Sequence, residues 1–174
     1  MKFYISDLHL FHDNIIKFCN RPFGSSHQMT KTIIANWNKK VGKNDEVYIL
    51  GDMFFRYDDI KDVVNILKQL NGKKHLIRGN HDKWVNDPRT HQYFESIKQY
   101  DEVDDGGRRV ILFHYPMEEW NGYYRNSYHL FGHVHNSVEH LSVVDRRYNV
   151  SADVINFTPQ TLTELIAANE HGKI

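Results

Sequence analysis

The sequence has few of the features that mark secreted or membrane proteins. Cysteine occurs once, at Cys19, so no intramolecular disulfide can form. Residues 1–7 lack both the charged and the apolar segment of a secretory signal, and no run of 18 or more apolar residues occurs. We therefore expect a cytoplasmic location, no membrane association and an inert Cys19.

The sequence also lacks an excess of either charge. Its 22 Lys and Arg residues balance 22 Asp and Glu residues, so the formal net charge is zero. No overall field draws the chain to nucleic acid, although a local basic groove is compatible with a neutral total. Its 174 residues suit one domain, spanning 1–174, with a full core but little room for a cap. The expected partner is therefore a small molecule.

Five short polar strings each stand directly after an apolar, β-prone run. They are D-L-H at 7–9, G-D at 51–52, G-N-H-D at 79–82, His114, and G-H-V-H at 132–135. The preceding runs are 2–5, 47–50, 75–77, 110–113 and 128–131. Because ligands and substrates gather at strand ends in α/β sheets, the pattern predicts one metal site built from five strand ends.

The candidate ligands are carboxylate, amide and imidazole groups: Asp7, His9, Asp52, Asn80, His114, His133 and His135. The absence of thiolates suits two divalent ions such as manganese better than a structural zinc. If one Asp bridges the ions, each has four protein ligands and keeps positions for water and phosphate oxygens. Paired ligands two residues apart point to the same side of an extended chain. The set therefore predicts hydrolysis with two metals.

The ordered strings D-x-H, G-D, G-N-H-D, H and G-H-x-H resemble those of calcineurin-like metallophosphoesterases, particularly small single-domain bacterial or phage enzymes. Each string is common alone, but all five in order, over residues 7–135, are highly specific. The resemblance implies two ligand groups around a bridging Asp52. The first group is Asp7, His9 and His135, and the second is Asn80, His114 and His133.

The resemblance also implies roles for residues that are not ligands. His81 falls on the catalytic histidine, which protonates the leaving oxygen or braces the phosphate, while Asp82 orients its imidazole. Arg56 has the offset of the arginine in the protein-phosphatase string G-D-x-x-D-R, where a guanidinium clamps a phosphate. Since Phe55 and Tyr57 replace the Asp and Gly of that string, protein phosphatase activity is not inferred.

Three further residues have both a functional and an ordinary interpretation. His12, three residues after His9, either contacts a phosphate or is an ordinary loop histidine. Tyr115, beside His114, either shapes the substrate pocket or packs in the core. Arg21 is either a substrate ligand or, as we favour, a solvated or ion-paired arginine. We take His12 and Tyr115, with Arg56, as the candidate substrate contacts.

Apolar periodicity predicts alternating helices and strands. One helix is expected at about 26–40, with Ser25 and Gln28 at capping-box spacing, and another at about 59–70. Strands are expected at 137–142 and 147–150, followed by a terminal helix with Thr158 as its N-cap. The resemblance implies a four-layer α/β/β/α sandwich of two mixed sheets flanked by helices. Spacing alone equally allows a doubly wound single sheet.

The expected reaction is in-line attack on a phosphodiester by a hydroxide that bridges the two ions. A diester is preferred because an uncapped site with a histidine at the leaving group suits diesters. Nucleotide and cyclic-nucleotide diesters are among the possible substrates. Manganese is the preferred ion, with iron, nickel, zinc and magnesium as alternatives. The alternative functions are a phosphomonoesterase, a metal-dependent nuclease and, from another class, a catalytically silent partner-binding scaffold.

Overall fold

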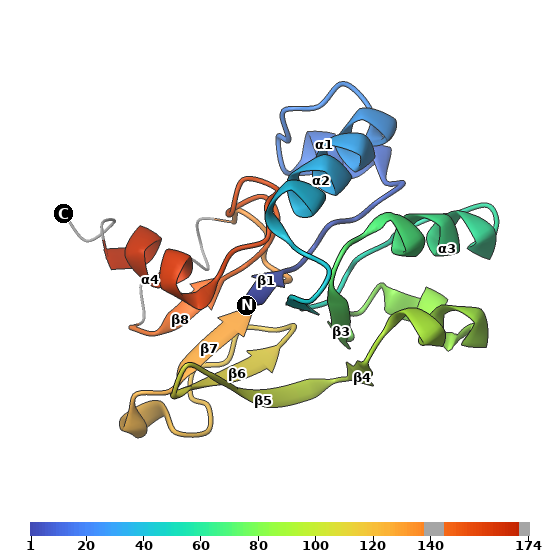
Figure 1. The fold of residues 1–174 in the computed structure, drawn as a ribbon. Helices are drawn as coiled ribbons and strands as arrows, with labels where there is room; N and C mark the ends of the chain where they lie inside the picture. Colours follow the sequence, from blue (N-terminus) through green and yellow to red (C-terminus); the bar gives the residue numbers. More distant parts are fainter. Residues whose placement is uncertain (138–144, 171–174) are drawn as a thin grey trace.

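The computed structural model describes residues 1–137 and 145–170, which form two four-stranded sheets flanked by helices (Figure 1). The first sheet has the order β1 (Lys2–Ile5), β2 (Glu46–Ile49), β3 (Lys73–Ile77), β4 (Ser96–Lys98), with every pair parallel. The second has the order β5 (Tyr100–Asp105), β6 (Arg108–Phe113), β7 (Tyr128–Phe131), β8 (Arg147–Asn149). Only β5 and β6 pair antiparallel there. The alternative of a doubly wound single sheet is therefore wrong.

The helices are α1 (Asp13–Phe18), α2 (Ser26–Lys40), α3 (Ile60–Gln69) and α4 (Leu162–Glu170). Short 3₁₀ helices span Asp82–Asn86, Pro88–Tyr93 and Tyr123–Arg125. Figure 1 shows α1, α2 and α3 on one side of the molecule and α4 apart from them. Within residues 1–137 and 145–170, no helix is long and apolar enough to cross a membrane.

Local sequence accounts for α2 and α3, and both predicted helices are confirmed. Ser25 Oγ accepts the amide of Gln28 at 3.2 Å, which satisfies one of the free N–H groups at the start of α2. Asp59 caps α3 in the same way, through the amide of Lys61 at 2.9 Å. The buried apolar residues of each helix belong to the same hydrophobic core as strand residues of the first sheet.

The start of the terminal helix differs from the prediction of Thr158 as its N-cap. Thr161 Oγ1 instead accepts the amide of Glu164 at 3.3 Å, and Glu164 Oε2 accepts the amide of Thr161 at 2.8 Å. Gln160 forms an antiparallel bridge with Tyr4, through N–O distances of 2.8 and 3.1 Å. This pairing keeps the chain extended up to Gln160, so α4 cannot begin earlier. The strand expected at 137–142 lies, apart from Ser137, outside the described residues.

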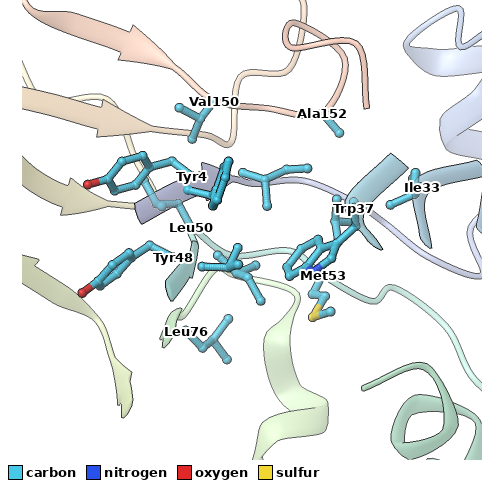
Figure 2. Packing of buried hydrophobic residues seen from close by; sticks show 14 of the residues in the cluster. Tyr4, Ile33, Trp37, Tyr48, Leu50, Met53, Leu76, Val150 and Ala152 are labelled. Atoms are coloured by element: carbon cyan, nitrogen blue, oxygen red, sulfur yellow. The ribbon is translucent and has the colours of Figure 1, made fainter. Parts of the chain in front are cut away.

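One hydrophobic core contains buried residues of both sheets. Figure 2 shows Tyr4, Leu50 and Leu76 of the first sheet region in the same buried cluster as Val150, which follows β8. The amide of Ser6 donates to Val150 O at 2.9 Å, so the end of β1 is paired with the end of β8. The strand ends that carry the polar strings therefore face the same region.

Candidate metal centre

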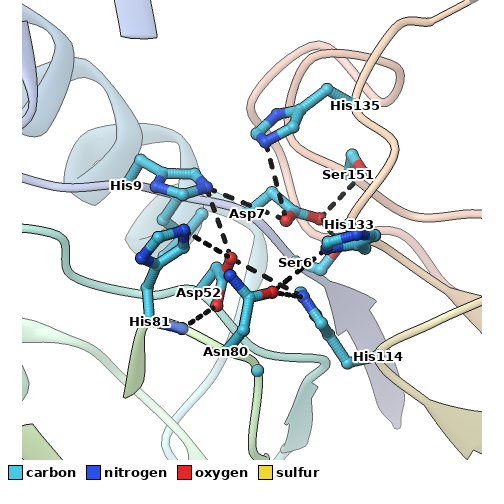
Figure 3. Close-up of polar contacts among 12 residues, drawn as sticks. Ser6, Asp7, His9, Asp52, Asn80, His81, His114, His133, His135 and Ser151 are labelled. Carbon is cyan, nitrogen blue, oxygen red and sulfur yellow. Dashed lines mark hydrogen bonds and ion pairs between the residues drawn. The ribbon is translucent and has the colours of Figure 1, made fainter. Parts of the chain in front are cut away.

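Backbone pairing continues past the strand ends and sets the positions of the first polar strings. The amide of Asp7 donates to Gly51 O and that of His9 donates to Asp52 O, both at 3.0 Å. In the second sheet, the amide of Gly132 donates to His114 O at 2.9 Å. The predicted convergence of these strings is therefore present in the fold (Figure 3).

Five of the seven candidate ligands have a left-handed backbone. Their φ angles lie between 47° and 70°, at Asp7, His9, Asp52, His133 and His135. Such a conformation is strained for residues with a side chain, by about 1–3 kcal/mol each, and persists only where surrounding contacts impose it. Strain of this kind concentrates at functional sites, where it aims side chains that a regular strand would point elsewhere.

Two glycines of the polar strings allow the backbone to approach the carboxylates closely. A Cβ atom at Gly79 would overlap Asp52 Oδ1, and one at Gly132 would overlap Asp7 Oδ2. Any larger residue would therefore push a candidate ligand out of place. The glycines in G-N-H-D and G-H-V-H are therefore required for the observed positions of Asp52 and Asp7.

The candidate ligands form two groups on either side of Asp52. The ligand atoms of Asp7, His9 and His135 lie within 4.8 Å of one another, as do those of Asp52, His114 and His133. Asn80 Oδ1 lies 3.1 Å from His114 Nε2 and 3.1 Å from His133 Nδ1 (Figure 3). Asp52 Oδ2 lies 3.7 Å from His9 Nε2 and 3.6 Å from His114 Nε2, and so faces both groups.

The two oxygens of the Asp7 carboxylate have different surroundings. Oδ2 accepts hydrogen bonds from Ser6 Oγ at 2.6 Å, Ser151 Oγ at 2.8 Å and the amide of His133 at 2.9 Å. Oδ1 is buried and, within the described residues, has no hydrogen-bond partner; the same holds for His9 Nε2, 3.9 Å away. The hydrogen bonds hold the carboxylate with one free oxygen directed at the histidines.

This arrangement fits a divalent cation. Asp7 and Asp52 are 0% and 2% exposed, and a buried carboxylate is stabilised by positive charge close to it. Oxygen and imidazole nitrogen are donors that manganese and similar ions accept. The unpaired Asp7 Oδ1 and His9 Nε2 and the two buried carboxylates therefore favour cation binding between these side chains.

Protonation of the candidate ligands also reflects their burial. Burial raises the pKa of Asp52 to about 7 and holds the pKa of His9 far below its usual value. Burial acts to lower the pKa of His135 as well, but the hydrogen bonds to Asp153 and Cys19 and the negative charges of Asp7 and Asp153 together outweigh it and raise this pKa to about 10. His9 thus offers a neutral nitrogen, whereas His135 must release a proton when a cation binds.

Asp153 and Arg21 form hydrogen bonds that hold the first ligand group in place. Asp153 Oδ2 accepts from His135 Nδ1 at 2.7 Å, which directs Nε2 toward Asp7. Arg21 is buried, donates to both oxygens of Asp153 at 2.7 and 3.0 Å, and donates to the carbonyls of Asp7 and Leu8 at 2.8 Å. The ion-paired interpretation of Arg21 is therefore confirmed.

Sequence reasoning missed Asp153 altogether. The signal was present, because Asp153 follows β8 closely, just as the other polar strings follow their strands. No motif of the resembling family marked it, and a single acidic residue after a strand is common. Only its contacts with His135 and Arg21 show what it does.

The prediction that Asp82 orients the imidazole of His81 is wrong. The buried Asp82 carboxylate accepts the amides of Asp52 at 2.8 Å, Met53 at 3.1 Å and Gly79 at 2.8 Å, together with Trp84 Nε1 at 2.8 Å. Both oxygens are directed inward, because Asp82 begins a 3₁₀ helix that packs Trp84 into the core. Asp82 therefore fixes the two ligand-bearing loops to each other.

His81 itself lies at the open side of the centre. Its amide donates to Asp52 Oδ1 at 2.9 Å, and its ring Nε2 lies 4.0 Å from Asp52 Oδ2. The ring is 40% exposed, so it can meet a bound molecule. Burial of the remainder lowers the pKa of His81.

The candidate substrate contacts lie around the centre but on different sides. His12 stacks on Phe55 and, with the exposed Arg56, lines a cavity beside His81. Tyr115 lies against the second ligand group, with its ring centroid 4.9 Å from that of His114 and 4.6 Å from that of His133. Their contact with a substrate stays a prediction.

Comparison with known proteins gives consistent matches. The family profile described as a calcineurin-like phosphoesterase superfamily domain matches residues 1–155. An uncharacterized protein of Methanocaldococcus jannaschii is 35% identical over 176 residues, covering 99% of this chain and 93% of its own. The gene 66 protein of Mycobacterium phage D29 is 30% identical over 128 residues, covering 65% and 62%. A solved protein of unknown function from Aquifex aeolicus superposes with a TM-score of 0.78 at 27% identity, covering 97% and 98%.

Proposed function

The chain belongs to the calcineurin-like phosphoesterase superfamily, and from that premise we propose that it is a single-domain phosphodiesterase that depends on two divalent cations. The position of Asp52 carries the proposal of two cations. One carboxylate oxygen of Asp52 faces both His9 and His114, at 3.7 and 3.6 Å, and these histidines belong to separate ligand groups. A single cation would use only one of the two groups.

We assign the first cation to Asp7, His9 and His135 and the second to Asn80, His114 and His133, with Asp52 shared. When bound, the two cations supply an activated water and polarise the phosphoryl oxygens. Manganese is the preferred ion on the donor chemistry, with iron, nickel, zinc and magnesium as alternatives. The buried hydrogen bonds behind the ligands keep them in place, which limits reorganisation during the reaction.

Three side chains of this protein act on the ester itself. The half-exposed ring of His81, beside Asp52, transfers a proton to the leaving oxygen or braces the phosphate. Arg56, exposed at the rim of the adjoining cavity, pairs with the charged phosphoryl oxygens. Tyr115 borders the second ligand group and limits how a substrate lies over it. The partner is a small phosphoester, and the neutral net charge does not indicate a nucleic acid.

Hydrolysis of two chromogenic esters tests the proposal. Protein stripped of metal is assayed on bis-p-nitrophenyl phosphate and on p-nitrophenyl phosphate, with and without manganese. We expect manganese-dependent cleavage, faster for the diester. His81→Ala should lower turnover by about 10²- to 10⁴-fold, the usual contribution of a general acid, while manganese still binds. His27→Ala, at an exposed histidine of α2, is the matched control and should retain activity.

The alternative functions give different results in the same experiment. Faster cleavage of the monoester would identify a phosphomonoesterase. Cleavage of nucleic acid, with binding that weakens steeply as salt rises, would identify a nuclease. Stoichiometric manganese binding without turnover of any ester would favour a partner-binding scaffold.

A further inference from the structure

An aromatic cavity adjoins the first ligand group. It has a volume of about 480 Å³, and the residues that line it include His9, His81 and His135, together with His12, Phe18 and Phe55. Pockets that hold small organic ligands span roughly 300–1,000 Å³. The cavity therefore has room for a substantial organic group attached to a phosphate at the ligand groups.

The rings of the wall are in contact with one another. His12 lies flat on Phe55, with centroids 3.8 Å apart and an angle of 16° between the planes. Phe18 meets His12 edge-on at 6.3 Å, and Phe55 meets His81 edge-on at 4.8 Å. The wall thus extends without interruption from the surface at Phe18 to the ring of His81.

Phe18 is the least protected of these rings. It is 75% exposed at the end of α1, whereas Ile15 of the same helix is buried and anchors it. A single exposed aromatic residue needs no explanation, but this one adjoins a wall of rings and a polar centre. Its exposed surface is available to cover a planar group, which would remove apolar surface from water on both sides.

The positively charged side chain of Arg56 also borders the cavity. The guanidinium carbon of Arg56 lies 5.7 Å from the centroid of Phe55, and Arg56 lines the same cavity. The cavity thus combines three features: a flat aromatic surface, the guanidinium of Arg56 and candidate metal ligands. These features match the base, the phosphate charge and the reacting phosphorus of a nucleotide ester.

We propose that the cavity of His12, Phe18 and Phe55 binds the base of a nucleotide, so that the substrate is a nucleoside phosphodiester. The inference rests on the proposed phosphodiesterase function and adds the substrate class and the residues that select it. The base lies against Phe18 and the stacked pair His12–Phe55, and the ester phosphate extends past His81 to the ligand groups.

Calorimetric titration with two probes tests the inference. Manganese-loaded protein is titrated with adenosine 5′-monophosphate, which is a product of diester cleavage, and with ribose 5-phosphate, which lacks the base. We expect the former to bind about 5- to 150-fold tighter, the range that stacking of one base on an aromatic side chain contributes. Phe18→Ala should reduce this ratio severalfold. Thermal unfolding should show that the variant folds, since Phe18 is exposed.

Tyr124 offers a matched control. It is 82% exposed and lines a different cavity, with Trp120 and Tyr123. Tyr124→Ala should leave the ratio between the two probes unchanged. If Tyr124→Ala abolishes the ratio and Phe18→Ala does not, the base binds in the other cavity and the inference is overturned.

The remaining outcomes separate this inference from the proposed function. Equal affinity of both probes for the unmodified protein overturns the base-binding cavity. If bis-p-nitrophenyl phosphate is then still cleaved in the presence of manganese, the proposed phosphodiesterase function stands on its own. If neither ester is cleaved with any divalent cation, the proposed function fails, and the inference fails with it.

Discussion

Replacing Asp153 by Asn should both destabilise the fold and weaken cation binding. Its carboxylate accepts hydrogen bonds from Arg21 at 2.7 and 3.0 Å and from His135 Nδ1 at 2.7 Å. The Arg21 and Asp153 side chains are 0% and 2% exposed, so water cannot replace either partner. The amide preserves the shape but removes the charge, leaving a buried guanidinium without a countercharge.

The magnitudes follow from these contacts. Breaking a buried ion pair from one side destabilises by about 3–5 kcal/mol. Losing the carboxylate behind a metal-binding histidine lowers metal affinity by roughly 10- to 100-fold. Arg21→Met leaves Asp153 unpaired and should be destabilising as well. The double variant should be less unstable than the sum of the single variants, with a coupling energy of about 0.5–3 kcal/mol, because it leaves no unpaired charge.

Two measurements check the prediction. Urea unfolding of the metal-free proteins gives the stability changes, and calorimetric titration with manganese gives the affinities. Asp58→Asn, at an exposed carboxylate, is the control and should change neither quantity. Strictly additive effects of Arg21→Met and Asp153→Asn would refute the coupling. Unchanged manganese affinity in Asp153→Asn would show that the hydrogen bond from His135 to Asp153 does not contribute to cation binding.

Two further predictions concern packing and pH. Gly132→Ala places a Cβ atom against Asp7 Oδ2, so the loop must shift. The free energy of unfolding should fall by about 1–3 kcal/mol, and manganese affinity should fall as well. His129 is buried, and its Nδ1 lies 3.2 Å from Ile111 O while its Nε2 accepts the amide of Met117 at 3.1 Å. Only the neutral ring can make both contacts, because Nε2 must be unprotonated to accept a hydrogen bond. Burial lowers its pKa from 6.5 to about 4. The unfolded chain therefore binds the proton first, and stability falls as the pH drops from 6.5 to 4, by about 2 kcal/mol at pH 5.

Matched variants check both predictions. Gly24→Ala, where the added atom meets only ordinary contacts, should leave manganese affinity unchanged; equal effects of the two glycine variants would contradict the steric argument. His129→Gln lacks the titrating ring, so its stability should fall less than that of the unmodified protein between pH 7 and pH 5. Parallel pH profiles in urea unfolding would show that His129 is not responsible.

The helices illustrate which parts of the fold are local. Capping and apolar periodicity identified α2 and α3, because a cap and the face of a helix involve residues only a few positions apart. The start of α4 was mispredicted at Thr158, because it depends on Gln160 pairing with Tyr4, 156 residues away. The choice between one sheet and two was likewise open, since strand pairing joins segments that no local pattern connects.

The candidate site divides in the same way. The sequence by itself determined which side chains have the donor chemistry for cations, because a carboxylate or imidazole directly after an apolar strand is a local signal. Only the tertiary structure decided that Asp82 joins two loops instead of orienting His81, and that Asp153 holds His135. A buried polar group takes the partners that the packing of distant segments places within 3 Å, and that packing is a property of the whole fold.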